Sequence, residues 1–183
     1  KHIHLLPAIF TVVAKLAREY GINCIRCPVE STASALGPFL RSRCSGWPRM
    51  AKQYLLGRAL STLAACQANK LADAGLYRTE YFFGLSQTGF LDVTILEQML
   101  RALPEGTSEM MCHPGYVDRA LKGMRTRLRA QREIELRALT SPGIRKLVDE
   151  LGIELIAYDK LHQAQAPIAR KHKETVQEVA RKG

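Results

Sequence analysis

Short apolar runs alternate along this chain with longer stretches in which apolar residues recur at helical spacing. The short runs are typical of strands, which we expect at residues 3–6, 22–26, 81–84, 108–112 and 153–158. The longer stretches predict helices at residues 8–20, 48–72, 93–103, 116–140 and 142–151. Residues 31–47, rich in serine, glycine and proline, are expected to form a long connection of the kind that serves as a binding loop or lid.

The order of these elements indicates the fold class. Strands that alternate with helices predict βα units around a parallel sheet or barrel, so we expect an α/β protein. In that class, ligands bind at the carboxyl ends of the strands. Arg26, Gly84 and His113 stand at such ends. His2 and His4 are expected near the same rim, because the strand that carries them is short.

A His-x-His pair, His2 and His4, opens the chain. Side chains two apart on a strand point to the same face, so the two imidazoles would lie close enough to share a metal or a substrate. A polar pair at a frayed terminus is the alternative, and the spacing alone does not separate the two. The Cys-His-Pro-Gly turn around His113 favours a site, because it adds another histidine at a strand end.

The composition is that of an ordinary globular protein. With 183 residues, 46% of them hydrophobic and 24% charged, the chain can bury one sizeable core. No apolar run approaches the roughly 18 residues of a membrane span, and no secretory leader is recognisable, so we expect a soluble, cytoplasmic protein. A Cys-x-x-Cys pair, Cys24 and Cys27, lacks the second pair that a zinc site would need. We expect reduced thiols.

The net charge of +10, with a pI near 9.6, raises the question of an anionic partner. The basic residues gather in two patches, one at Arg119, Lys122, Arg125, Arg127, Arg129, Arg132 and Arg137 and one at Arg170, Lys171, Lys173, Arg181 and Lys182. Neither patch has the interleaved aromatic residues that stack on bases. A solvated helix face and a loose tail are the favoured interpretation, and no nucleic-acid partner is expected.

Several sequence blocks, taken in order, resemble the YdjC-like carbohydrate deacetylases, also called the ChbG/HpnK family. The blocks are Lys1-His2-Ile3-His4-Leu5-Leu6-Pro7, Glu19-Tyr20-Gly21-Ile22, Arg26-Cys27-Pro28-Val29-Glu30, Phe83-Gly84-Leu85-Ser86-Gln87-Thr88-Gly89 and Glu109-Met110-Met111-Cys112-His113-Pro114-Gly115. The resemblance covers roughly residues 1–160, with 161–183 as a basic tail, helical or disordered. The block at 83–89 is closer to the HpnK branch, which is associated with hopanoid biosynthesis.

The resemblance implies a (β/α) barrel-like, TIM-barrel-related fold and a hydrolase that removes N-acetyl groups from an amino sugar or glycolipid. It implies a divalent metal, Mg²⁺ as the first candidate and Zn²⁺ as the second. His113 is expected to protonate the leaving amine, with metal contact as the alternative, and His4 to bind substrate. Arg26 is expected to bind substrate, with a structural pair to Glu30 as an equal alternative. His2 is the candidate metal ligand.

Two further acidic residues, Asp118 and Glu80, are expected to be solvated rather than part of the site.

The chain departs from the family pattern in its acidic residues. The family carries an Asp-Asp-Phe-Gly-like motif that supplies a carboxylate, and this chain contains no Asp-Asp pair. The main metal-binding histidine aligns one residue before Lys1. We therefore expect the C-terminal portion of a deacetylase, without the N-terminal barrel strands and with an open edge that favours a homodimer. The alternative is a non-catalytic basic protein that binds nucleic acid or anionic lipid.

Overall fold

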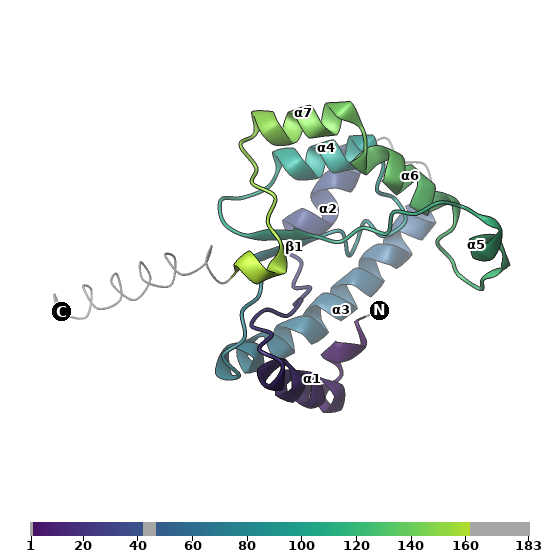
Figure 1. The fold of residues 1–183 in the computed structure, drawn as a ribbon. Helices are drawn as coiled ribbons and strands as arrows, with labels where there is room; N and C mark the ends of the chain where they lie inside the picture. Colours follow the sequence, from purple (N-terminus) through teal and green to yellow (C-terminus); the bar gives the residue numbers. More distant parts are fainter. Residues whose placement is uncertain (1, 42–46, 162–183) are drawn as a thin grey trace.

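The structure is a computed structural model that describes residues 2–41 and 47–161. It is an α/β fold, mostly helical with a small parallel sheet (Figure 1). In chain order the elements are η1 Ile3–Leu5, α1 Pro7–Glu19, α2 Thr32–Arg41, α3 Trp47–Asp73, β1 Tyr81–Phe83, α4 Val93–Arg101, β2 Ser108–Met110, α5 Arg119–Gly123, α6 Ala130–Leu139, α7 Pro142–Glu150 and η2 Tyr158–Lys160.

The sheet consists of β1 and β2, which pair in parallel with Phe82 opposite Glu109. One further parallel bridge joins Cys24 to Tyr77. The predicted parallel pairing is therefore confirmed for the strands at 81–84 and 108–112. A closed barrel does not form among residues 2–41 and 47–161, where the sheet has two strands.

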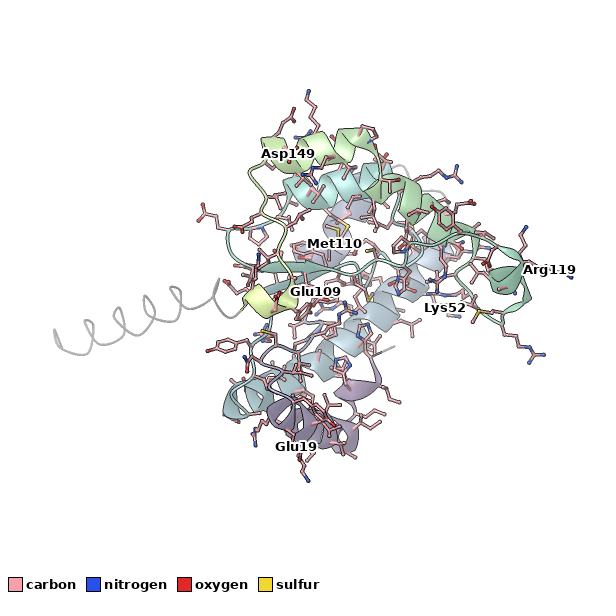
Figure 2. All side chains as sticks on the ribbon, viewed as in Figure 1. Glu19, Lys52, Glu109, Met110, Arg119 and Asp149 are labelled. Carbon is pink, nitrogen blue, oxygen red and sulfur yellow. The ribbon has the colours of Figure 1, made fainter. Side chains whose placement is uncertain are left out.

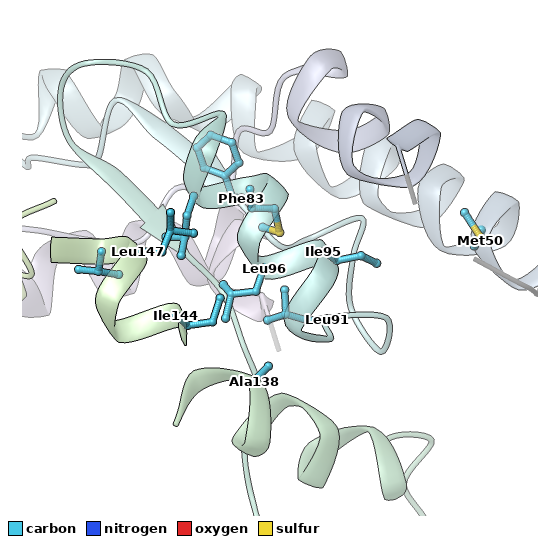
Figure 3. Packing of buried hydrophobic residues seen from close by; sticks show 11 residues of the cluster. Met50, Phe83, Leu91, Ile95, Leu96, Ala138, Ile144 and Leu147 are labelled. Atoms are coloured by element: carbon cyan, nitrogen blue, oxygen red, sulfur yellow. The ribbon is translucent and has the colours of Figure 1, made fainter. Parts of the chain in front are cut away.

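Two main apolar clusters form the core. The first fills the space between β1, α4, α6 and α7, where Figure 3 shows Phe83, Leu96, Ile144 and Leu147 in one group. The second packs η1 and α1 against α3, and its buried members are Leu5, Phe10, Ala14, Ala17, Cys27, Ala64, Leu71 and Leu76. Because α3 contributes to both clusters through Met50 and Ala64, it is the element that joins them.

The helices with clear apolar stripes, α1, α4 and α7, form where the sequence predicts them. The long helix α3 also forms where it is expected, although Leu55 and Leu56 of its predicted apolar set are exposed. Asp92 caps α4, its side chain accepting a 2.8 Å hydrogen bond from the Ile95 N–H. Pro7 and Pro142 occupy the first turns of α1 and α7, where proline loses no helical hydrogen bond.

The expected first strand, residues 3–6, is wrong, since η1 is a turn of 3₁₀ helix. The N–H groups of Leu5 and Leu6 bond back to the carbonyls of His2 and Ile3, both at 3.1 Å. No partner strand lies beside this segment among the described residues, so the backbone satisfies its hydrogen bonds locally. The buried Leu5 side chain fixes the turn on the α1–α3 cluster.

Two other expected strands are reduced or absent. The strand at 22–26 is limited to the Cys24 bridge, in which the Ile25 N–H donates to the Tyr77 carbonyl at 2.9 Å. Residues 153–157 are extended chain outside any strand and lead into η2.

The expected connection at 31–47 contains the helix α2, so the prediction of a long loop is wrong. Ser31 begins it, because its Oγ accepts the Ser34 N–H at 3.0 Å as an N-cap does. The helix tolerates Pro38 in its interior. Residues 42–46 lie outside the described chain.

The single helix expected at 116–140 is two helices, α5 and α6, with irregular chain between them. Met124, which follows α5, has extended backbone angles, and Arg129, which precedes α6, is also non-helical. Since the arginine-rich stretch has no apolar stripe to bury, nothing holds it as one helix.

None of the helices in the described part of the chain has the length and apolar character that a membrane crossing requires. The expected tail at 161–183 lies, apart from Leu161, outside the described residues.

Candidate active site

The carboxyl ends of β1 and β2 form one edge, as expected for parallel strands. The Met111 N–H donates to the Phe83 carbonyl at 2.9 Å and continues the pairing beyond β2. Gly84 follows β1 with φ +95°, and a Cβ at this position would lie 2.3 Å from the Met111 carbonyl oxygen. Only glycine fits this crossing, which places the segment after β1 against the one that leads to His113.

His113 stands three residues after β2 and is half-buried. Its backbone N–H donates to the carboxylate of the buried Glu135 on α6. Its ring nitrogen Nδ1 is buried and has no hydrogen-bond partner among the described residues. Burial, together with the charges of Arg132 and Arg26, lowers the pKa of His113. The imidazole is therefore neutral near pH 7.

His2 and His4 flank the first residue of η1 with their ring centroids 6.0 Å apart. The Nε2 atom of His4 lies 3.0 Å from the carbonyl oxygen of Arg26. Because a carbonyl only accepts, Nε2 carries the proton, and Nδ1 of His4 is left with its lone pair. Burial lowers the pKa of His4, although the hydrogen bond to Arg26 acts in the opposite direction. The two imidazoles therefore lie close together, as expected, although residues 3–6 form a 3₁₀ turn and not a strand.

Arg26 is held by two residues that the sequence did not indicate. Its Nε donates to Oε1 of the buried Glu109 at 2.5 Å, and the Tyr158 hydroxyl donates to Oε2 of the same carboxylate. Figure 2 shows Glu109 beside η2, which carries Tyr158. The guanidinium lies 5.9 Å from the centre of the Phe82 ring. The side chain is 42% exposed, so its other N–H groups can meet a ligand.

The alternative pairing of Arg26 with Glu30 is wrong. The buried Glu30 carboxylate accepts the N–H groups of Leu85 and Ser86, at 3.2 and 3.0 Å, and the Ser86 hydroxyl at 2.5 Å. Burial raises the pKa of Glu30, and these three donors partly offset that rise. Glu30 therefore fixes the segment after β1 and does not face Arg26.

The two acids expected to be solvated each bind backbone. Glu80 accepts hydrogen bonds from the N–H and the hydroxyl of Thr107, at 3.2 and 3.1 Å, and so joins the segments that precede β1 and β2. Asp118 is exposed and caps α5 by accepting the Leu121 N–H at 2.7 Å.

The predicted site residues share one electrostatic environment. Burial, followed by the charges of His4 and Arg26 and with a smaller effect of His113, lowers the pKa of His2 to about 4. Arg26 likewise lowers the pKa of His4 and of His113. The charge of Arg26 thus acts on histidines from η1 and from the segment after β2, although these two segments are far apart in sequence.

This environment predicts how acid affects stability. The folded pKa of His2 is depressed from 6.5 to about 4, so the unfolded chain binds a proton in this window that the folded chain does not. The contribution of His2 to stability is fully present above 6.5, its pKa in the unfolded chain, and is lost as the pH falls toward about 4. The Tm difference between His2→Gln and wild type (variant minus wild type) should therefore change with pH. We expect it to be roughly 2–4 °C more positive at about pH 5 than at about pH 7.5. Equal differences in thermal melts at the two pH values would contradict this.

The described residues do not form a metal site by themselves. No group of three or more His, Cys, Asp or Glu side chains in the described ranges is arranged to hold an ion. His2 and His4 are the nearest approach, and Nε2 of His4 is already engaged by a carbonyl. Two imidazoles are fewer than the three protein ligands of a catalytic zinc site.

We therefore expect this chain to bind divalent ions only weakly. Calorimetric titration with Zn²⁺ and with Mg²⁺ should show no tight one-to-one binding, because at most two imidazoles are available. The His2→Gln and His4→Gln double variant provides the control, and it should remove the weak Zn²⁺ signal. Tight binding that survives the double variant would place the ion elsewhere.

Comparison with known proteins identifies similar sequences over most of the chain. The model of the family described as YdjC-like protein matches residues 1–150. A human protein named carbohydrate deacetylase is 27% identical over 175 residues, which is 88% of this chain and 51% of that protein. A Yersinia enterocolitica chitooligosaccharide deacetylase is 27% identical over 159 residues, covering 86% of this chain and 49% of that protein.

A Vibrio parahaemolyticus carbohydrate deacetylase is 37% identical over a shorter stretch of 89 residues, which is 45% of this chain and 34% of that protein. The chain thus spans about half the length, or less, of the curated relatives that it matches. No solved structure gives a significant match.

Proposed function

Because the chain belongs to the YdjC-like protein family, we propose that it forms part of a carbohydrate deacetylase. The substrate would be an N-acetylated amino sugar or glycoconjugate, as the names of the deacetylase relatives suggest. One observation in the molecule carries this proposal: the charges of His4, Arg26 and His113 all act on His2, and His113 follows the carboxyl end of β2. Such strand ends are where α/β proteins bind their ligands.

Hydrolysis of an acetamide requires attack of water on the carbonyl carbon, cleavage of the C–N bond and protonation of the leaving nitrogen. We assign the last step to His113, because its half-buried imidazole follows the carboxyl end of β2, where α/β proteins bind their ligands. The imidazole of the free protein is neutral near pH 7, since burial lowers its pKa. Negative charge on the tetrahedral intermediate raises that pKa, so the imidazole would take up the proton that the attacking water loses and pass it to the leaving nitrogen.

Arg26 and His4 are proposed to orient the sugar. Glu109 and Tyr158 fix the guanidinium of Arg26, whose remaining N–H groups can donate to sugar oxygens. Nδ1 of His4 can accept a hydrogen bond from a sugar hydroxyl, because the opposite ring nitrogen donates to the Arg26 carbonyl. A fixed donor and a fixed acceptor side by side suit a polyhydroxylated ligand.

Finer features of the assignment rest on the resemblance alone. We propose that the chain is the C-terminal portion of a barrel enzyme from the hopanoid-associated HpnK branch. The divalent metal would polarise the acetyl carbonyl, with Mg²⁺ as the first candidate and Zn²⁺ as the second. His2 is the described residue that we assign to it, and no step proposed above depends on the ion.

The sugar-binding role predicts a selective effect on KM. For Arg26→Gln in the intact protein we expect KM for an N-acetylglucosamine disaccharide to rise about 10- to 100-fold, with little change in kcat, because a charged hydrogen bond to substrate is lost. Acetate release measures both constants. Arg58→Gln is the control, since Arg58 is also half-buried but donates to the Glu30 carbonyl, at 2.8 Å. No acetate release by folded wild-type protein supplied with Mg²⁺ or Zn²⁺ would contradict the deacetylase function.

A further inference from the structure

Residues 115–132 form an arm that leaves the body of the molecule next to the candidate site and returns to it. The Gly115 N–H donates to the Arg132 carbonyl at 3.1 Å and closes the base of this arm. The arm contains α5, which has no buried residue and projects away from the other helices (Figure 1). Its base begins two residues after His113, so its position and that of the site are linked.

The arm is strongly basic. Its sequence holds one acidic residue, Asp118, and the basic residues Arg119, Lys122, Arg125, Arg127, Arg129 and Arg132. The carboxylate of Asp118 is used to cap α5. Figure 2 shows Arg119 at the outer end of the arm, pointing away from the body.

Three of these cations, Arg119, Lys122 and Arg125, are exposed and form no ion pair with a described residue. The helices that follow the arm differ in this respect. Arg137, Arg145 and Lys146 each lie within 4 Å of an acidic residue one turn further along or back on the same helix, at 3.7, 3.6 and 3.3 Å. Compared with α6 and α7, the arm therefore carries an excess of unpaired positive charge.

Apolar side chains are exposed among these cations. Tyr116 is 76% exposed and Met124 is 58% exposed. Cations beside an aromatic ring and a flexible apolar side chain match the interface of an anionic bilayer, where headgroups meet acyl chains. A single-stranded nucleic acid would instead require several aromatic side chains for stacking, and the arm has only Tyr116.

We propose that residues 115–132 dock this protein on the surface of an anionic lipid bilayer. Arg119, Lys122 and Arg125 would contact the lipid phosphates, and Met124 would enter the interface. Docking would bring the base of the arm, and with it the candidate site, to the membrane surface. The proposal goes beyond the deacetylase function and does not depend on it, because its test measures lipid binding alone.

Vesicle co-sedimentation tests this with the full chain. The wild type should sediment with phosphatidylcholine vesicles that contain phosphatidylglycerol, and much less with phosphatidylcholine alone. The triple variant Arg119→Gln, Lys122→Gln, Arg125→Gln should bind on the order of 100-fold more weakly, and each single variant about fivefold. The control is Arg137→Gln, Arg145→Gln, Lys146→Gln, which removes the same charge outside the arm and should stay within about twofold of wild type. Both variants keep the basic residues of 162–183.

Four results would overturn the proposal. Wild-type protein that does not sediment with the anionic vesicles does not dock on them. An equal loss of vesicle binding in the arm variants and in the control would mean that only net charge matters. Full vesicle binding by the arm variants would mean that another surface of the protein contacts the lipid. Tighter binding to a single-stranded DNA oligonucleotide, which also displaces the protein from vesicles, would make the arm a nucleic-acid contact. Circular dichroism melts establish that each variant is folded.

Discussion

The His113→Ala variant of the intact protein should deacetylate an N-acetylglucosamine-containing substrate about 10²- to 10⁴-fold more slowly than wild type at saturation, which is the usual contribution of a positioned general acid. The loss follows from the assignment of the leaving-group proton to the imidazole of His113, which follows the carboxyl end of β2. Acetate release gives kcat, and metal analysis of the same sample gives the ion content, which should change little.

Pro114→Ala is the matched control for this variant. It alters the same exposed turn but leaves the imidazole in place, so its kcat should remain within about threefold of wild type. If His113 instead binds the metal, activity and ion content fall together. An unchanged kcat in folded His113→Ala protein would contradict the proton-donor role and leave the residue as part of the turn.

The largest effect on stability is expected at Gly84. Gly84→Ala places a Cβ 2.3 Å from the Met111 carbonyl oxygen and forces an alanine to φ +95°. Positive φ costs about 1–2 kcal/mol. Relief of the backbone clash costs about another 1–3 kcal/mol. We therefore expect the free energy of unfolding to fall by roughly 2–5 kcal/mol, measured by urea denaturation.

Gly21→Ala separates the two causes. Gly21 also has positive φ, +64°, but a Cβ there would meet nothing within 4 Å. This variant should therefore lose only about 1–2 kcal/mol, the cost of the backbone conformation. Equal losses for Gly21→Ala and Gly84→Ala would mean that the close approach of the two segments contributes nothing.

Local signals account for the parts of the fold that could be predicted. The helices α1, α4 and α7 combine an apolar stripe with a start signal at Pro7, Asp92 or Pro142, so both boundaries and burial follow from the sequence. The run at 3–6 gave no such guidance, because four residues before a proline fit a strand or a turn equally well. Its conformation is set by the burial of Leu5 against α3, which is a tertiary contact.

The residues of the candidate site also divide into those that local sequence indicates and those that only tertiary contacts reveal. His2, His4 and His113 could be selected from residue type and place in the chain, and the folded chain brings them into one electrostatic environment. Glu109 and Glu135 could not, because their partners Arg26 and His113 are 83 and 22 residues away. A buried acid carries no sequence mark of its own, and only the folded chain reveals which positive or N–H group it meets.

The contacts of Glu30 have a consequence for redesign of this protein. Loops usually accept insertions, because few of their groups are bonded to the rest of a structure. The segment after β1 is an exception, because the N–H groups of Leu85 and Ser86 donate to the carboxylate of Glu30, more than 50 residues earlier in the chain. The backbone N–H of Glu30 in turn donates to the hydroxyl of Ser61 on α3. An added residue here would break hydrogen bonds that link this segment through Glu30 to α3, whereas residues 154–157 are exposed and offer room for a tag or a graft.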